Sequence, residues 1–200
     1  MRIVAHIISI IFHPILMPVI GMFLIFKAGT HLSLLTLQAK QAILIVIFIS
    51  TVILPLSIHP ILYQFKIIKS YRMESTRERI IPILITAFFY YTAFLLLKKM
   101  GVPTMLCKYI ISAAITVFVS AIITYFWKIS IHMMGIGGLS GVITAISLKY
   151  GIDLLFLQIL LISASALTAS ARLYLGDHNP SQVYTGYIFG FVIIFSFIIF

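Results

Sequence analysis

Long apolar runs separated by short polar stretches make up most of the chain. Seven runs can be marked, each close to the roughly 20 residues that a helix needs to cross a bilayer. They cover residues 3–26, 40–62, 80–98, 105–127, 133–150, 153–172 and 181–200. Because backbone groups in lipid must find their hydrogen bonds within the segment, each run should be helical. The pattern predicts an all-α protein, a polytopic transmembrane bundle of about six or seven spanning helices.

Residues 1–200 are expected to form a single transmembrane domain, because no long polar linker and no tandem repeat divides them. The first run follows Arg2 and resembles a signal peptide. Pro14 and Pro18 interrupt it, however, and no small-residue cleavage site follows. We therefore interpret it as the first spanning helix.

The composition indicates an integral membrane protein. Of the 200 residues, 62% are hydrophobic and 9% are charged, and no water-soluble domain could bury so much apolar surface. The net charge is +10, from 14 Lys and Arg residues against four acidic ones. The expected partners are therefore the lipid bilayer and an anionic lipid or phosphate, and no nucleic acid.

Counting membrane crossings predicts that three polar clusters lie on one side of the bilayer. Two crossings separate the stretch 66–79 from the stretch 128–132, and two more separate the latter from the stretch 172–182. The N-terminus is expected on the same side, because the first two runs form an out-and-back pair. Three clusters on one side are what a site built by several helices requires.

Basic and histidine side chains make up most of these clusters. The first cluster contains Lys66, Lys69, Arg72, Arg77 and Arg79, the second Lys128, Ser130 and His132, and the third Arg172, His178 and Gln182. Guanidinium groups bind phosphate oxygens through paired hydrogen bonds. A neutral imidazole can attack phosphorus while a protonated one donates to the departing oxygen. The clusters therefore indicate a site for phosphoryl chemistry.

The clusters resemble the three-part signature of the type 2 phosphatidic acid phosphatase superfamily. That signature is Lys-x6-Arg-Pro, then Pro-Ser-Gly-His, then Ser-Arg-x5-His-x3-Asp. The third part is matched by Arg172-x5-His178-x3-Gln182. The second keeps Ser130 and His132 but has isoleucine in place of the proline and the glycine. The first is matched more weakly by Arg72-x6-Arg79, with the same spacing, arginine in place of lysine and the proline delayed to Pro82.

The resemblance covers about residues 66–190 and implies a phosphatase-like core there. It implies that His178 is the nucleophile that forms a phosphohistidine and that His132 protonates the leaving group. The residues expected to hold the phosphate oxygens are Arg172, Arg79, Arg72 and Ser130, and the substrate-binding set is completed by Lys128, Gln182 and Arg77.

Gln182 occupies the place of the acidic residue that orients the nucleophilic histidine in the family. A glutamine carbonyl can still accept the imidazole N–H, but it cannot offset the charge of an imidazolium. We therefore expect either slower turnover or a substitute acid, for which Asp177 and Glu74 are the candidates.

The function that this resemblance implies is that of a lipid phosphatase. It would hydrolyse a phosphomonoester or diphosphate of a membrane lipid without a metal or other cofactor. Two alternatives stay open: a phosphotransferase that passes the phosphoryl group to a second lipid or sugar, and a lipid-binding or transport protein that has lost the chemistry. A zinc site is not expected, because no two histidines have helical ligand spacing. We interpret His6, His13 and His59 as structural, and expect His13-Pro14 and His59-Pro60 at helix bends or ends.

The distribution of basic residues predicts an orientation. Apart from the expected phosphate-site residues, the site side retains Arg2, Lys66, Lys69 and Arg77, whereas the other side has Lys27, Lys40, Lys98, Lys99, Lys108 and Lys149. Cytoplasmic loops are enriched in Lys and Arg, so the site is expected to face away from the cytoplasm. In a bacterial inner membrane it would face the periplasm or exterior. The resemblance then implies a polyprenyl diphosphate, phosphatidylglycerol phosphate or a lipid A phosphate as the substrate.

Two pairs of glycines have the spacing that lets helices approach closely. They are Gly137-x3-Gly141 and Gly186-x3-Gly190. The spacing fits packing within the chain and also a homodimer.

Overall fold

The structure, a computed structural model, describes residues 2–70 and 76–200, apart from the side chains of residues 76 and 77. In chain order the elements are α1 (Arg2–Ile11), η1 (Pro14–Leu16), α2 (Met17–Lys27), η2 (His31–Leu34), α3 (Leu37–Phe48), η3 (Ile49–Ile53), α4 (Leu54–Gln64), α5 (Thr76–Lys99), α6 (Thr104–Phe126), α7 (Ile131–Tyr150), α8 (Leu155–Tyr174) and α9 (Pro180–Ile199). Every regular element of the described chain is helical, which confirms the all-α prediction.

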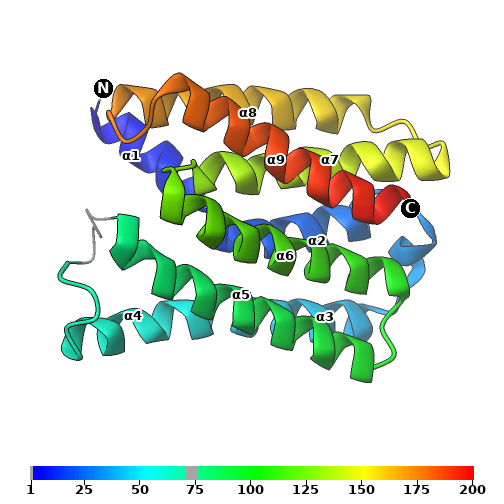
Figure 1. The fold of residues 1–200 in the computed structure, drawn as a ribbon. Coiled ribbons are helices and arrows are strands. Elements are labelled where there is room, and N and C mark those ends of the chain that lie inside the picture. The colour runs from blue at the N-terminus through cyan, green and yellow to red at the C-terminus, as the bar shows by residue number, and fades with distance from the viewer. Residues whose placement is uncertain (1, 71–75) are drawn as a thin grey trace.

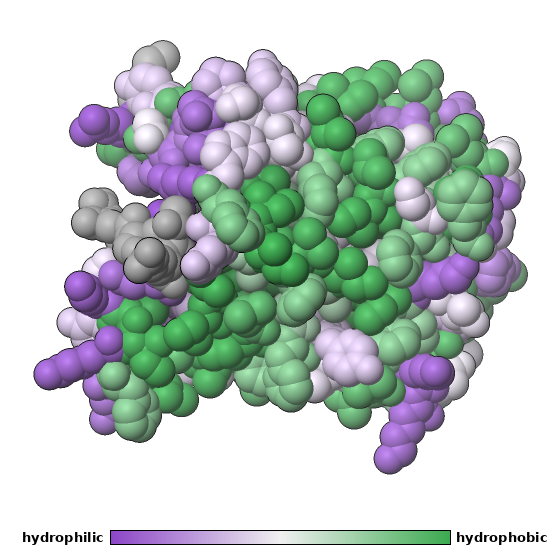
Figure 2. All heavy atoms as spheres, in the orientation of Figure 1, coloured by the Kyte–Doolittle hydropathy of each residue, from purple (hydrophilic) through white to green (hydrophobic). Residues whose placement is uncertain are grey.

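Seven helical stretches in the described residues are long and apolar enough to cross a bilayer. The first combines α1, η1 and α2, the second combines α3, η3 and α4, and α5 to α9 supply one each. Figure 1 shows them as one bundle with the two termini at opposite ends. In Figure 2 a broad apolar surface lies between two hydrophilic ends, as expected for an integral membrane protein.

Prolines interrupt the two N-terminal spans. α1 ends at Ile11 and η1 begins at Pro14, because proline has no N–H to continue the helical hydrogen bonds. The second span contains the π-helix η3 just before Pro55. The predicted bend at His13-Pro14 is therefore present, whereas Pro60 lies inside α4, which continues to Gln64.

The helices α6 and α7 form the centre of the bundle. In their most apolar stretches 56% and 67% of the residues are buried, against 22–33% in the other five spans. The outer helices therefore present most of their surface to lipid, while α6 and α7 contact protein on most sides.

Four glycines bring α7 and α9 into backbone contact. A Cβ atom on any of them would lie closer than 3.0 Å to a backbone carbonyl oxygen across the contact. For three of them this oxygen belongs to the other helix, and for Gly186 it belongs to Ser130, the residue just before α7. The pairs are Gly137 with Tyr187, Gly141 with Phe191, Gly190 with Met134, and Gly186 with Ser130. Both glycine pairs seen in the sequence thus pack within the chain, and the two helices run parallel from the same end of the bundle (Figure 1).

We predict that Gly137→Ala and Gly190→Ala each destabilise the protein by about 1–3 kcal/mol, because the added methyl group meets backbone and forces α7 and α9 apart. Thermal unfolding in detergent measures the effect. Gly138→Ala is the matched control: its methyl group would meet mainly the flexible end of Ile194, and the gain in helix propensity of about 1 kcal/mol offsets that contact. Equal melting temperatures for all three variants would contradict the close packing.

Candidate active site

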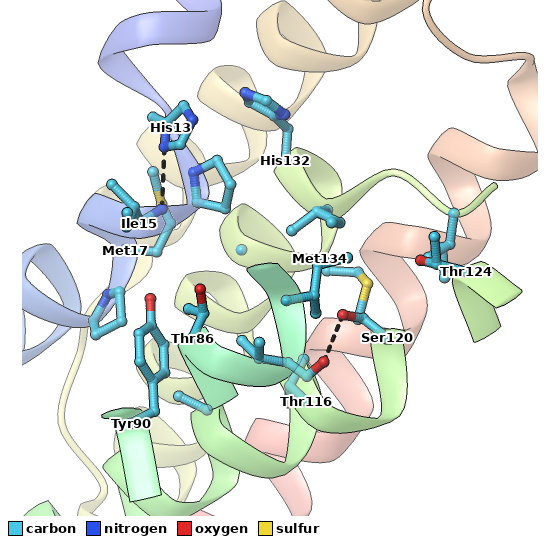
Figure 3. Close-up of a pocket in the computed structure, with 18 of the residues that line it drawn as sticks. His13, Ile15, Met17, Thr86, Tyr90, Thr116, Ser120, Thr124, His132 and Met134 are labelled. Carbon is cyan, nitrogen blue, oxygen red and sulfur yellow. Dashed lines mark hydrogen bonds between the residues drawn. The ribbon is translucent and has the colours of Figure 1, made fainter. Parts of the chain in front are cut away.

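A cavity of about 400 Å³ opens into the bundle between its central helices. It follows α6 from Tyr109 to Thr124, about 22 Å at 1.5 Å per residue. Figure 3 shows Thr116 and Ser120 along this wall, with the Tyr90 hydroxyl pointing into the space from α5. Apolar side chains supply most of the lining, and charged groups gather at one end.

The charged end brings together residues that are remote in the sequence. Arg79 comes from the start of α5, His132 from the start of α7, Arg172 from the end of α8, and Asp177 and His178 from the turn before α9. All of these positions lie at the end of the bundle that carries the N-terminus (Figure 1). The crossing count predicted this common side, and the structure adds that the five side chains line one cavity.

The other residues that the sequence led us to expect at the site do not line the cavity or lie outside the described residues. Lys128, Ser130 and Gln182 lie next to the lining residues without lining the cavity themselves. Arg72 lies outside the described residues, as does Glu74, the second candidate for a substitute acid. The side chain of Arg77 is likewise outside the described part of the chain.

The hydrogen bonds of Gln182 determine the tautomer of His178. The Oε1 atom of Gln182 accepts from the backbone N–H of Asn179 at 3.2 Å and lies 3.1 Å from Nδ1 of His178. Since a carbonyl oxygen only accepts, His178 must donate from Nδ1. Its Nε2 atom then carries the lone pair in the neutral imidazole, which is the form that a nucleophile needs.

A helix cap holds Gln182 in place. Asn179 is the N-cap of α9, its side chain accepts from the Gln182 N–H at 3.0 Å, and the reciprocal contact completes a capping box. Gly176, at φ +71°, turns the chain just before Asp177 and His178, a backbone conformation that glycine adopts without strain. Local turn chemistry thus directs His178 into the site.

Burial lowers the pKa of His178 from 6.5 to about 4, although its hydrogen bond to Gln182 acts in the opposite direction. The positive charges of Arg172, Lys128 and Arg79 lower it further. His178 is therefore neutral at physiological pH. Burial also lowers the pKa of Lys128, as do the nearby guanidinium groups, while the Asp177 carboxylate opposes that shift.

Two nitrogens of the Arg172 guanidinium have partners among the described residues. Its Nη2 atom lies 2.8 Å from Oδ2 of Asp177, and its Nη1 atom donates to the hydroxyl of Ser9 at 3.4 Å. Asp177, a candidate for the substitute acid, thus contacts the arginine, and no described contact joins it to the His178 ring. Its half-exposed side chain leaves the pair open to exchange with another anion.

Three buried polar atoms in or beside the cavity have no hydrogen-bond partner among the described residues. They are the Nε atom of Arg172 and the hydroxyls of Ser130 and Thr124. Ser130 precedes α7, and its backbone N–H donates to the Gln182 carbonyl at 3.3 Å, which joins the starts of α7 and α9. Unsatisfied buried donors are rare in folded proteins, and an anion in the cavity would give them a role.

His13 and His59 also line the cavity, although the sequence led us to interpret both as structural. The His13 ring makes an edge-on contact with His132, with 5.3 Å between ring centroids and an angle of 81°. His59 donates from Nδ1 to the Pro55 carbonyl at 2.8 Å. An ionisable side chain inside a membrane span is itself a functional signal, and it applied to both residues.

The described residues contain no group of three His, Cys, Asp or Glu side chains that could hold a metal ion. Comparison of the chain with protein-family models, curated proteins and solved structures finds no match. Fold and cavity define an integral membrane helical bundle with a basic, histidine-lined site at one end.

We predict that Gln182→Glu raises the pKa of His178 well above about 4, because a carboxylate beside Nδ1 stabilises the imidazolium. Glutamate keeps the capping box, so the fold is preserved. Titration of the ¹⁵N-labelled imidazole by NMR measures the change, with Gln182→Leu as the control that lacks an acceptor and should lower the pKa. An unchanged titration in Gln182→Glu would show that the two side chains do not touch.

Proposed function

We propose that the protein is a metal-independent lipid phosphatase that acts through a phosphohistidine at His178. It hydrolyses a phosphomonoester or diphosphate of a membrane lipid, of the polyprenyl diphosphate, phosphatidylglycerol phosphate or lipid A type. The observation that carries the proposal is the His178 imidazole, held by Gln182 with its Nε2 lone pair available, in the cavity that His132 and Arg172 also line. The resemblance to the type 2 phosphatidic acid phosphatases agrees with this assignment.

The proposed reaction has two steps. The Nε2 lone pair of His178 attacks phosphorus, and the bond from phosphorus to the lipid oxygen breaks as the protonated His132 gives that oxygen its proton. Water then attacks the phosphohistidine while the now neutral His132 takes a proton from the water, which releases phosphate and restores the neutral His178 and the protonated His132. Arg172 and Arg79 offset the negative charge that the phosphoryl oxygens carry throughout.

The shape of the cavity supports a lipid substrate. Its charged end holds the histidines and arginines, and the remainder passes along α6, where uncharged apolar and hydroxyl-bearing side chains line it. A phosphate at the charged end would leave the hydrocarbon part of the same molecule among the helices. A soluble phosphate ester would gain nothing from the apolar part.

One observation favours the alternative of a binding protein without chemistry. Gln182 stands where the family has an acid, and Asp177 is engaged with Arg172. No carboxylate among the described residues is then in contact with His178 to stabilise its protonated form. Binding of a lipid phosphate without turnover would assign the chain to this class.

We predict that His178→Ala reduces phosphate release by at least about 10³-fold, because the nucleophile is lost. Short-chain phosphatidic acid and farnesyl diphosphate in detergent serve as substrates, with EDTA present because no metal is needed. His6→Ala, at an exposed position of α1, is the control and should retain activity. Undiminished release by His178→Ala, or activity that EDTA abolishes and a metal ion restores, would exclude the mechanism.

We also propose that the site faces the periplasm or exterior of a bacterial inner membrane. In a Cys107→Ser background, a cysteine at the exposed Ser181 should react in whole cells with a membrane-impermeant maleimide. A cysteine at Leu34, which is 85% exposed at the opposite end of the bundle, should react only after the cells are opened. The reverse pattern would place the site in the cytoplasm.

A further inference from the structure

The N-terminal helix reaches the charged end of the cavity through the turn at His13. α1 ends at Ile11, and His13 is the N-cap of η1, with extended backbone angles. Its Nδ1 atom accepts from the backbone N–H of Ile15 at 3.3 Å. Because Nδ1 accepts, the proton of the neutral ring is on Nε2, and the ring is fixed at one edge.

The fixed His13 ring packs against the ring of His132. Figure 3 shows the two imidazoles near each other at the top of the view, and their planes are nearly perpendicular, at 81°. The backbone of Ser9, one turn earlier, lies close to the same His132 ring. The segment from Ser9 to His13 therefore makes two contacts with the proposed acid, besides the contact of the Ser9 hydroxyl with Arg172.

A helix cap alone does not account for a histidine at this position. Asparagine, aspartate and serine are the side chains that cap best, and any of them could accept from Ile15. The imidazole adds a flat ring that reaches His132, whose own ring torsion has only broad, roughly two-fold preferences. Around this pair lie Arg172 from α8, His59 from α4 and His178 from the turn before α9.

We propose that His13 is a positioning residue, which holds the imidazole of His132 in the orientation that faces the leaving group. The inference rests on the proposed function, because it gives His13 a role in that reaction. It also extends the site beyond residues 66–190, to the first span of the chain.

Two variants separate positioning from capping. His13→Asn keeps an acceptor for the Ile15 N–H and removes the ring, whereas His13→Phe keeps a ring and removes the acceptor. Without the His13 ring, His132 should be misplaced. The kcat of His13→Asn on short-chain phosphatidic acid should therefore fall by about 10²-fold, with KM within about two-fold of wild type. His13→Phe should recover a large part of that loss, and His6→Asn should match wild type.

A His13→Asn variant with wild-type kcat would overturn the inference and leave the proposed phosphatase intact. Melting temperatures of the variants in detergent identify any that fail to fold. An inactive wild-type protein would instead remove the proposed function. In that case NMR of ¹⁵N-histidine-labelled protein tests the contact between the rings of His13 and His132 by itself. The His132 signals should shift in His13→Asn while those of His31 stay; unchanged His132 signals would also overturn the inference.

Discussion

The contact between α7 and α9 is the constraint on which the geometry of the site depends. Glycines on both helices face backbone carbonyls of the other, so the helices touch without intervening side chains. In a bilayer, where apolar side chains gain little by leaving lipid, such close packing supplies much of the association energy. The contact fixes the relative heights of Ser130 and Gln182, whose backbones are hydrogen-bonded, and so places His132 and His178 at one level.

Around this pair of helices the other elements contribute one group each. α8 supplies Arg172 at its last turn, α5 supplies Arg79 at its first, and the N-terminal turn supplies His13. Because each element ends or bends at the same side of the bundle, short polar segments suffice to build the site. The apolar remainder of every helix stays available for packing and for lipid.

Much of this arrangement follows from the sequence, and part of it does not. The run 133–150 corresponds to α7 (Ile131–Tyr150) and the run 153–172 to α8 (Leu155–Tyr174), because hydropathy directly reports the length of a span. The common side of the charged clusters follows from counting crossings. The position of His13 does not, because it depends on how α1 packs against α8, and the Arg172–Asp177 pair depends on the turn at Gly176.

Most of the described charged side chains in and beside the cavity are basic. The guanidinium groups of Arg79 and Arg172 line the cavity together with the carboxylate of Asp177, which is paired with Arg172. Lys128 lies beside them, and its pKa is lowered by burial and by the two guanidinium groups, while Asp177 opposes that shift. Concentrated positive charge in a partly buried site costs free energy unless an anion offsets it. Burial, together with the same charge, keeps His178 neutral by lowering its pKa. In the proposed reaction, these features would favour an anionic phosphate and leave the Nε2 lone pair of His178 free to attack it, with Gln182 as the partner of Nδ1.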